Sequence, residues 1–135
     1  MDIEGLRQIF RFEVSRYAYT DEERKLKLRK AYRQIEATLR ETVRQLQLSG
    51  GGGYIPYGPL AEVLAQSARQ LAGELDRYRS ALSPEMVRAL AKLSAQLSQA
   101  QQQVSAHSDS LAEQLPQWAE ELEGLKRALG EIHRL

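Results

Sequence analysis

The sequence contains no cysteine, and this absence excludes several kinds of site. A disulfide framework, a thiolate zinc site and a cysteine nucleophile all need residues that the chain lacks. This leaves the compartment open, with the cytoplasm as the default expectation. We expect no metal or other cofactor, because the two histidines, His107 and His133, have no spacing that assembles a ligand set.

Long apolar runs are also missing. No window approaches the ~20 uninterrupted apolar residues of a membrane-spanning helix. The first residues, Met1-Asp2-Ile3-Glu4, carry acid before any base, and no apolar core of a secretory signal follows them. Only 7% of residues are aromatic, and leucine and alanine dominate the apolar residues. Because strand alternation and hairpin signals are absent as well, the composition favours helix over sheet.

Glycine and proline are concentrated in one place, where residues 49–59 read Ser-Gly-Gly-Gly-Gly-Tyr-Ile-Pro-Tyr-Gly-Pro. This composition predicts a linker that cannot be helical. It follows a basic segment, since residues 1–48 hold 11 Lys/Arg and 8 Asp/Glu, whereas residues 54–135 hold 8 and 10. Two interpretations remain open: a natural hinge within one domain, or an engineered linker that fuses two partner chains.

Apolar residues recur at steps of three and four on both sides of this linker, which predicts five helices. A short first helix precedes a second over residues 21–48, whose start is marked by a capping box of Thr20 and Glu23. Together they form a basic hairpin, residues 1–48. The expected stripes are Ile3, Leu6, Phe10, Val14 and Tyr17 in the first helix, and Leu28, Tyr32, Ile35, Leu39, Val43 and Leu46 in the second.

Residues 60–135 are expected to form a three-helix segment. The third helix is predicted over residues 59–82, and Ser83-Pro84-Glu85 marks the start of the fourth. We expect a break near Ser108, with Ser110 and Glu113 as a capping box for the last helix; the alternative is one long helix kinked at Pro116. The stripes are Leu60, Leu64, Ser67, Leu71, Leu75, Tyr78 and Leu82; Val87, Leu90, Ser94, Leu97, Gln101, Val104 and Ser108; and Leu111, Leu115, Trp118, Leu122, Leu125, Leu129 and Ile132.

These helices predict an all-α fold, an antiparallel bundle of four long helices preceded by a short one, with coiled-coil-like packing in a single domain. The fourth stripe is weak, since Ser94 and Gln101 occupy core positions in it. A weak seam of this kind is often completed by a partner, which favours an oligomer. A thin core with a polar outer face is the other interpretation.

No catalytic motif is present, so we expect a non-enzymatic module that binds another protein or a second copy, as an adaptor, a chaperone-like protein or an assembly subunit. The candidate contact residues are apolar side chains in the linker or off the main helical stripes. They are Tyr54, Ile55, Tyr57, Ile9, Phe12 and Leu26. A purely flexible linker would not hold two tyrosines and an isoleucine, so docking of this part within the chain is a further expectation.

The alternative function is binding of nucleic acid or of an anionic membrane through a basic ridge on the second helix. Its cations are Arg24, Lys25, Lys27, Arg29, Lys30, Arg33, Arg40 and Arg44. Among them, Lys25, Arg29 and Arg33 recur every four residues, and Arg40 and Arg44 approximately extend this row. Acidic residues are interleaved with it, and the net charge of the whole chain is only +1. These two observations favour the interpretation of the ridge as a solvated helix face.

Overall fold

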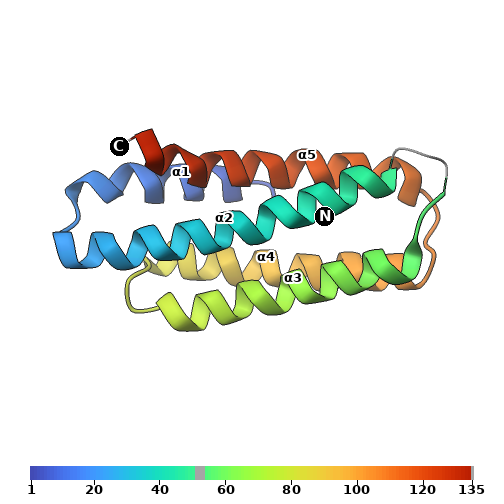
Figure 1. The fold of residues 1–135 in the computed structure, drawn as a ribbon, viewed down its shortest axis with the longest axis horizontal. Helices are drawn as coiled ribbons and strands as arrows, with labels where there is room; N and C mark the ends of the chain where they lie inside the picture. The colour runs from blue at the N-terminus through green and yellow to red at the C-terminus, as the bar shows by residue number, and fades with distance from the viewer. Residues whose placement is uncertain (51–53, 135) are drawn as a thin grey trace.

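A computed structural model describes residues 1–50 and 54–134, without side-chain detail for His133 and Arg134. The predicted all-α bundle is confirmed, and the described residues form no strand (Figure 1). The elements in chain order are α1 (Leu6–Arg16), the 3₁₀ helix η1 (Tyr17–Tyr19), α2 (Glu22–Gly50), α3 (Tyr57–Tyr78), α4 (Pro84–Ser105), α5 (Leu111–Gly130) and the 3₁₀ helix η2 (Glu131–Arg134).

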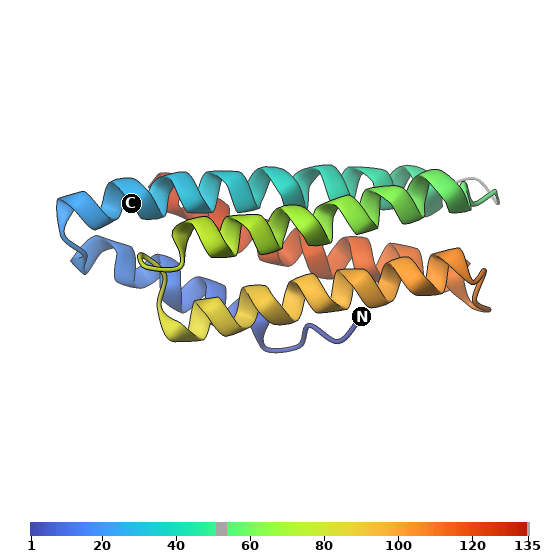
Figure 2. The same cartoon turned by 90° about the horizontal axis from the view of Figure 1, so that it is seen from below.

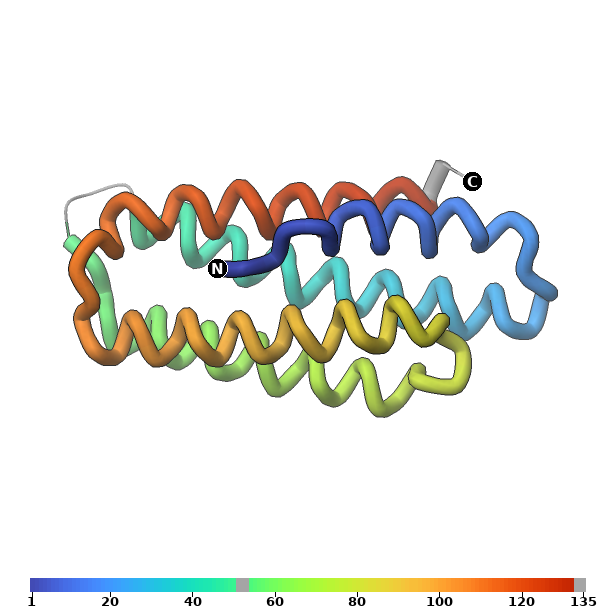
Figure 3. The backbone as a smooth tube through the Cα atoms, turned by 180° about the vertical axis from the view of Figure 1, so that it is seen from behind, coloured from blue at the N-terminus to red at the C-terminus, as the bar shows by residue number. Residues whose placement is uncertain are grey.

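The four long helices pack as successive neighbours, α5 against α2, α2 against α3 and α3 against α4 (Figure 2). The remaining side of the bundle is different, because α4 and α5 make little direct contact with each other along their described lengths. The short helix α1 contacts both of them. Figure 3 shows the first residues of the chain crossing between α5 and α4 before α1 continues beside α5.

The core is built from the predicted stripes of α1, α2, α3 and α5, whose members are buried except for Tyr78, which is partly buried against it. The largest side chains that are almost wholly buried are Trp118, Tyr32 and Phe10. They come from α5, α2 and α1, so the short helix contributes to the same core as the long ones. The amphipathic spacing of three and four therefore locates most of the core.

The stripe predicted for α4 is wrong in register. Leu93 and Ala100 occupy the core positions, while Ser94 and Gln101 lie at its margin and are only half-buried. The Ser94 hydroxyl donates to the Ala68 carbonyl at 2.8 Å, so it has the hydrogen-bond partner that a serine near a core needs. The actual stripe, Met86, Leu90, Leu93, Leu97, Ala100 and Val104, is continuous and apolar, which removes the weak seam as an argument for an oligomer.

The predicted starts of α2, α4 and α5 agree with the structure, but only one of the three predicted side-chain caps forms. Ser83 caps α4 as predicted, since its hydroxyl accepts from the Met86 backbone N–H at 3.1 Å. Thr20 does not cap α2, because its hydroxyl donates back to the Arg16 carbonyl, and the Asp21 carboxylate accepts from the Arg24 N–H at 2.9 Å instead. Ser110 precedes α5 in a left-handed conformation, at φ 72°, and its side chain makes no cap.

The predicted ends of the helices agree with the structure before α5 and differ from it at the end of α3. The break before α5 is confirmed, because α4 ends at Ser105 and α5 begins at Leu111. The predicted third helix is too long, since α3 ends at Tyr78 and residues 79–82 form a turn. Pro116 lies inside α5, which excludes the alternative of one long helix kinked at this proline.

The predicted linker is too long at both ends. Ser49 and Gly50 continue α2, and residues 57–59 form the first turn of α3, so only the middle of the segment lies between helices. At Gly50, the space that a Cβ atom would fill borders Pro116 at 3.7 Å, so α2 continues along the start of α5. Residues 51–53 lie outside the described residues. The choice between a natural hinge and an engineered linker concerns these residues and stays open.

Candidate interaction surface

The outer face of α1 brings together two of the predicted contact residues. Phe12 is 61% exposed, which is unusual for an aromatic side chain on a regular helix, and Ile9 lies one turn before it, partly buried against the core. The Arg16 guanidinium lies 5.7 Å from the centre of the Phe12 ring, in a cation–π contact. A groove of about 230 Å³ runs beside this face, between α1 and α4, lined by Glu4, Gly5, Leu6, Ile9, Glu85, Arg88, Ala89 and Lys92.

The inner face of α1 carries a buried carboxylate. Glu13 is only 5% exposed, and Ser83 at the start of α4 donates a hydrogen bond to it. Nearby, the Arg24 side chain of α2 donates to the Ala81 carbonyl at 2.8 Å, which holds the turn before Ser83. Three elements that are distant in sequence therefore meet through polar contacts at this end of the bundle.

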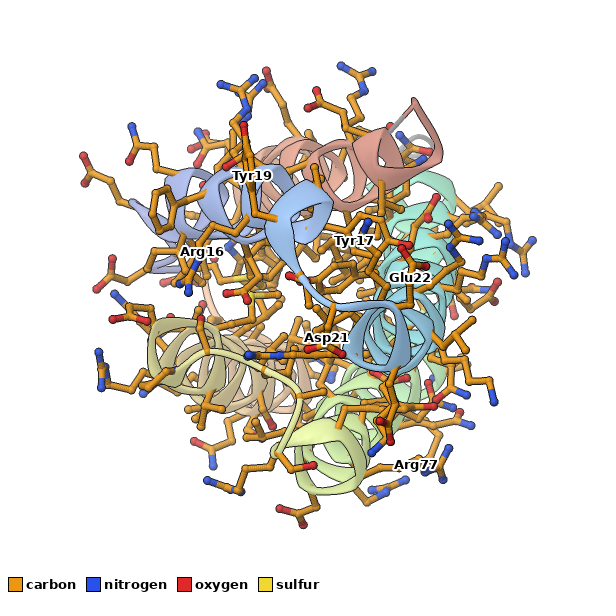
Figure 4. The ribbon with its side chains drawn as sticks, turned by 90° about the vertical axis from the view of Figure 1, so that its left-hand side faces the viewer. Arg16, Tyr17, Tyr19, Asp21, Glu22 and Arg77 are labelled. Carbon is orange, nitrogen blue, oxygen red and sulfur yellow. The ribbon has the colours of Figure 1, made fainter. Side chains whose placement is uncertain are left out.

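Tyr17 lies in the same region and points into the bundle, whereas Tyr19 points away from it (Figure 4). Lys25 and Arg29 of α2 lie 5.5 and 5.8 Å from the centre of the Tyr17 ring. These cation–π contacts join η1 to α2. They also give two cations of the basic ridge a role within the fold.

Contacts within the fold engage several cations of the basic ridge, which reduces the number that remain available to a ligand. Arg24 is used by the Ala81 carbonyl, Lys25 pairs with Glu22, and Arg40 and Arg44 pair with Glu36 and Glu41. Arg44 also lowers the pKa of the Glu41 carboxyl, through a hydrogen bond on a fully exposed surface. Among the described residues, four exposed cations of the ridge have no acidic partner: Lys27, Arg29, Lys30 and Arg33.

The three predicted contact residues after the glycines separate into two groups. Ile55 and Tyr57 are partly buried against the core, and the Tyr57 ring stacks on His107 with centroids 3.7 Å apart and planes 8° apart. His107 has a left-handed backbone, at φ 53°, which turns the chain after α4. Tyr54 is 77% exposed instead. The expected docking within the chain is therefore observed for Ile55 and Tyr57 and is not observed for Tyr54.

Other exposed apolar side chains belong to residues outside α1. Leu26 is exposed near the start of α2, as expected from its place off the stripe. Tyr19 and Leu48 are also exposed, although they are not among the predicted contact residues. Leu48 could have been found by the same test, because it follows the stripe residue Leu46 by two positions and so falls on another helix face.

The larger hollows of the described chain are open grooves with acidic groups. One, of about 570 Å³, lies between the first residues and α5, where desolvation raises the pKa of the Glu121 carboxyl. Another, of about 520 Å³, lies between α2 and α3 and includes Glu74. Within residues 1–50 and 54–134, no group of three or more His, Cys, Asp or Glu is placed to hold a metal ion.

No described helix combines the length and the apolar character that crossing a membrane requires. Comparison of the chain with protein-family models, with curated proteins and with solved structures gives no match.

Proposed function

We propose that this chain is a non-enzymatic protein–protein interaction module, acting as an adaptor, a chaperone-like protein or an assembly subunit. The observation that carries the proposal is the exposure of Phe12 on the outer face of α1, next to Ile9 and Arg16. Phenylalanine and arginine are enriched at protein interfaces, and an exposed ring beside a groove gives a partner an apolar anchor. The proposed compartment is the cytoplasm, which suits a chain without cysteine.

The contact is expected to be small and centred on α1. Charged groups of both signs, including Glu85, Arg88 and Lys92, surround the apolar residues along the groove. Such an arrangement resembles the polar rim around an interface core, and it suits a partner that contributes one apolar side chain between charged ones. Tyr54 and Leu26 lie elsewhere and would belong to other contacts.

Site-specific photo-cross-linking in the cell that naturally makes this protein tests the proposal. A benzoylphenylalanine placed at position 12 is expected to give a discrete cross-linked product, and the additional change Ile9→Lys is expected to abolish it. The same probe at Gln66, an exposed position on α3, serves as the control. Identical products from both positions, or no product from position 12, would contradict the proposal.

The alternative proposal is anion binding through the part of the ridge that has no acidic partners. Lys27, Lys30 and Arg33 are exposed on α2, and a row of cations on one helix suits the phosphates of nucleic acid or of anionic lipid. Binding to duplex DNA and to phosphatidylserine vesicles should be measured at ~50 and ~200 mM salt, because phosphate contacts weaken steeply with salt.

A matched pair of variants makes this second test specific. Replacing Lys27, Lys30 and Arg33 by glutamine is expected to abolish binding. Replacing Lys25, Arg40 and Arg44, which are paired with acids, by glutamine removes as many charges and is expected to change it much less. Equal losses from the two variants would indicate a response to net charge alone, and no binding at low salt would end the proposal.

A further inference from the structure

The helix α1 is short and depends on the helices around it. It spans 11 residues, its first turn has no acidic residue, and Gly5 before it provides no side-chain cap. Isolated helices of fewer than ~12–15 residues are marginal in water. Its apolar face, with Leu6, Phe10 and Val14, is buried, and α1 contacts both α4 and α5 where these two make little contact with each other. Docking therefore accounts for most of its stability.

The connection between α1 and α2 contains no residue that opposes helical geometry. Residues 17–21, Tyr-Ala-Tyr-Thr-Asp, contain no glycine and no proline, so each of them can adopt helical geometry. Local interactions favour the observed turn. The Thr20 N–H donates to the Tyr17 carbonyl at 3.1 Å, and the Asp21 carboxylate caps α2 by accepting from the Arg24 N–H. Figure 4 shows this turn at one end of the bundle, where no other element covers Tyr19.

We propose that α1 exchanges between two copies of this chain, with α1 and α2 joining into one helix and α1 docking between α4 and α5 of the second copy. The second copy can bind α1 because its site between α4 and α5 is identical to the site that α1 fills in its own chain. Ser83 supplies a hydroxyl for Glu13, and the Gln96 side-chain oxygen accepts from the Asp2 backbone N–H at 2.7 Å. Exchange of an identical element preserves these contacts and is a low-cost route to a dimer.

This inference is independent of the proposed function. Exchange uses the inner face of α1, whereas the proposed contact with a partner uses Phe12 on its outer face. Exchange itself does not bury the outer face, because α1 docks through the same inner face in the closed monomer and in the exchanged dimer. Loss of exchange would leave the photo-cross-linking experiment unaffected, and Phe12 variants can be tested in a chain that does not exchange.

Two variants of the connection should shift exchange in opposite directions. Glu22 is the first residue of α2, where proline is favoured, but in a joined helix proline would clash with the Ala18 carbonyl. Glu22→Pro is therefore expected to keep the monomer and abolish exchange, with Glu22→Ala as its matched control. Asp21→Ala removes the cap that favours the turn, and is expected to increase the exchanged population by about fivefold.

Cross-linking distinguishes exchange from ordinary association. The chain has no native cysteine, and the space for a Gly124 Cβ atom on α5 lies 3.7 Å from Arg7 Cδ on α1, so Arg7→Cys and Gly124→Cys place two thiols close together. A short bis-maleimide should link them within one chain in the monomer and between chains in the exchanged dimer. Chains carrying either cysteine alone are the controls for random collisions.

The measurement is made on the full chain, unfolded and refolded at high concentration, with mass determined by light scattering and by denaturing gel. We expect a dimer with interchain links, more of it in Asp21→Ala and none in Glu22→Pro. A chain that stays monomeric even as Asp21→Ala would overturn the inference. A dimer whose links are all within one chain, or whose amount is unchanged by Glu22→Pro, would overturn it as well.

Discussion

The Ser83 hydroxyl donates a hydrogen bond to the Glu13 carboxylate, and the same oxygen accepts one from the Met86 backbone N–H. Both side chains are buried, at 3% and 5% exposure. One serine thus caps α4 and satisfies an acid on α1, 70 residues away in sequence. The position of α1 is thereby coupled to the start of α4.

Ser83→Ala is expected to destabilise the fold by ~2–4 kcal/mol, because it removes a helix cap and leaves a buried carboxylate without its hydrogen bond. The free energy of unfolding from urea titration measures this loss. Glu13→Gln is the control, since an amide oxygen still accepts from Ser83. The double variant Ser83→Ala with Glu13→Leu should recover part of the loss, and equal costs for the single and double variants would contradict the coupling.

Half of this pair was predictable from the sequence. Ser83 precedes proline and glutamate, which is a local signal that needs no tertiary structure. The predicted stripe of the first helix omits Glu13 because it lists apolar residues only. Phe10, Glu13, Val14 and Tyr17 nevertheless have the i, i+3, i+4, i+7 spacing of one helix face. The signal for its burial was present in the periodicity. The hydrogen bond between Glu13 and Ser83 could not be predicted, because contacts between distant helices have no local signature in the sequence.

The register of α4 shows a second limit of the sequence. Leu90, Leu97 and Val104 belong both to the predicted stripe and to the observed one, so periodicity alone does not decide between them. The choice between Leu93 and Ser94 depends on where α3 lies, and the hydrogen bond from Ser94 to Ala68 reflects that position. The ends of the glycine segment were likewise decided by packing, since α5 borders Gly50.

Glu74 should make the stability depend on pH. Burial raises the pKa of its carboxyl from the usual 4.5, partly offset by the Thr38 hydrogen bond and by Arg77. Thr38 Oγ1 lies 2.9 Å from Glu74 Oε1 and 3.1 Å from the Gln34 carbonyl oxygen, but it has one proton and donates to one of them at a time. The other carboxylate oxygen, Oε2, is buried without a partner. A protonated Glu74 suits this site better.

The sign follows from proton linkage. The folded state holds the Glu74 proton more tightly than the unfolded state, so this stabilisation is complete below pH 4.5 and is lost as pH rises through the folded pKa. Glu74→Gln should therefore be more stable than wild type at neutral pH, and the difference should vanish below pH 4.5. Urea titrations across this range test it. A difference that does not change with pH would refute the assignment.

Two glycines should respond to alanine in opposite directions. Gly73 lies inside α3, and no atom lies within 4 Å of the place that a Cβ would take, so Gly73→Ala should stabilise the fold by ~0.5–1 kcal/mol. Gly5 has equal space but a left-handed backbone, at φ 86°, so Gly5→Ala should destabilise it by ~1 kcal/mol. Thermal unfolding of both variants measures the contrast, and a shift of the same sign would contradict it.

Tyr32 is a fully buried tyrosine whose hydroxyl has no hydrogen-bond partner among the described residues. Burial, followed by the charge of Glu13, raises the pKa of this phenol far above its usual value, so the hydroxyl is neutral at neutral pH. A buried hydroxyl without a partner costs free energy that phenylalanine avoids. Tyr32→Phe is therefore expected to stabilise the fold by ~1 kcal/mol.

Tyr32→Leu provides the matched control for this prediction, because it removes the same hydroxyl and also leaves a cavity in the core, at a cost of ~2–4 kcal/mol. Chemical denaturation of wild type and both variants gives the two differences. Destabilisation by Tyr32→Phe would contradict the prediction, because it would show that the hydroxyl contributes a stabilising hydrogen bond. A gain would instead identify the Tyr32 hydroxyl as a buried group that the packing of the core leaves unsatisfied.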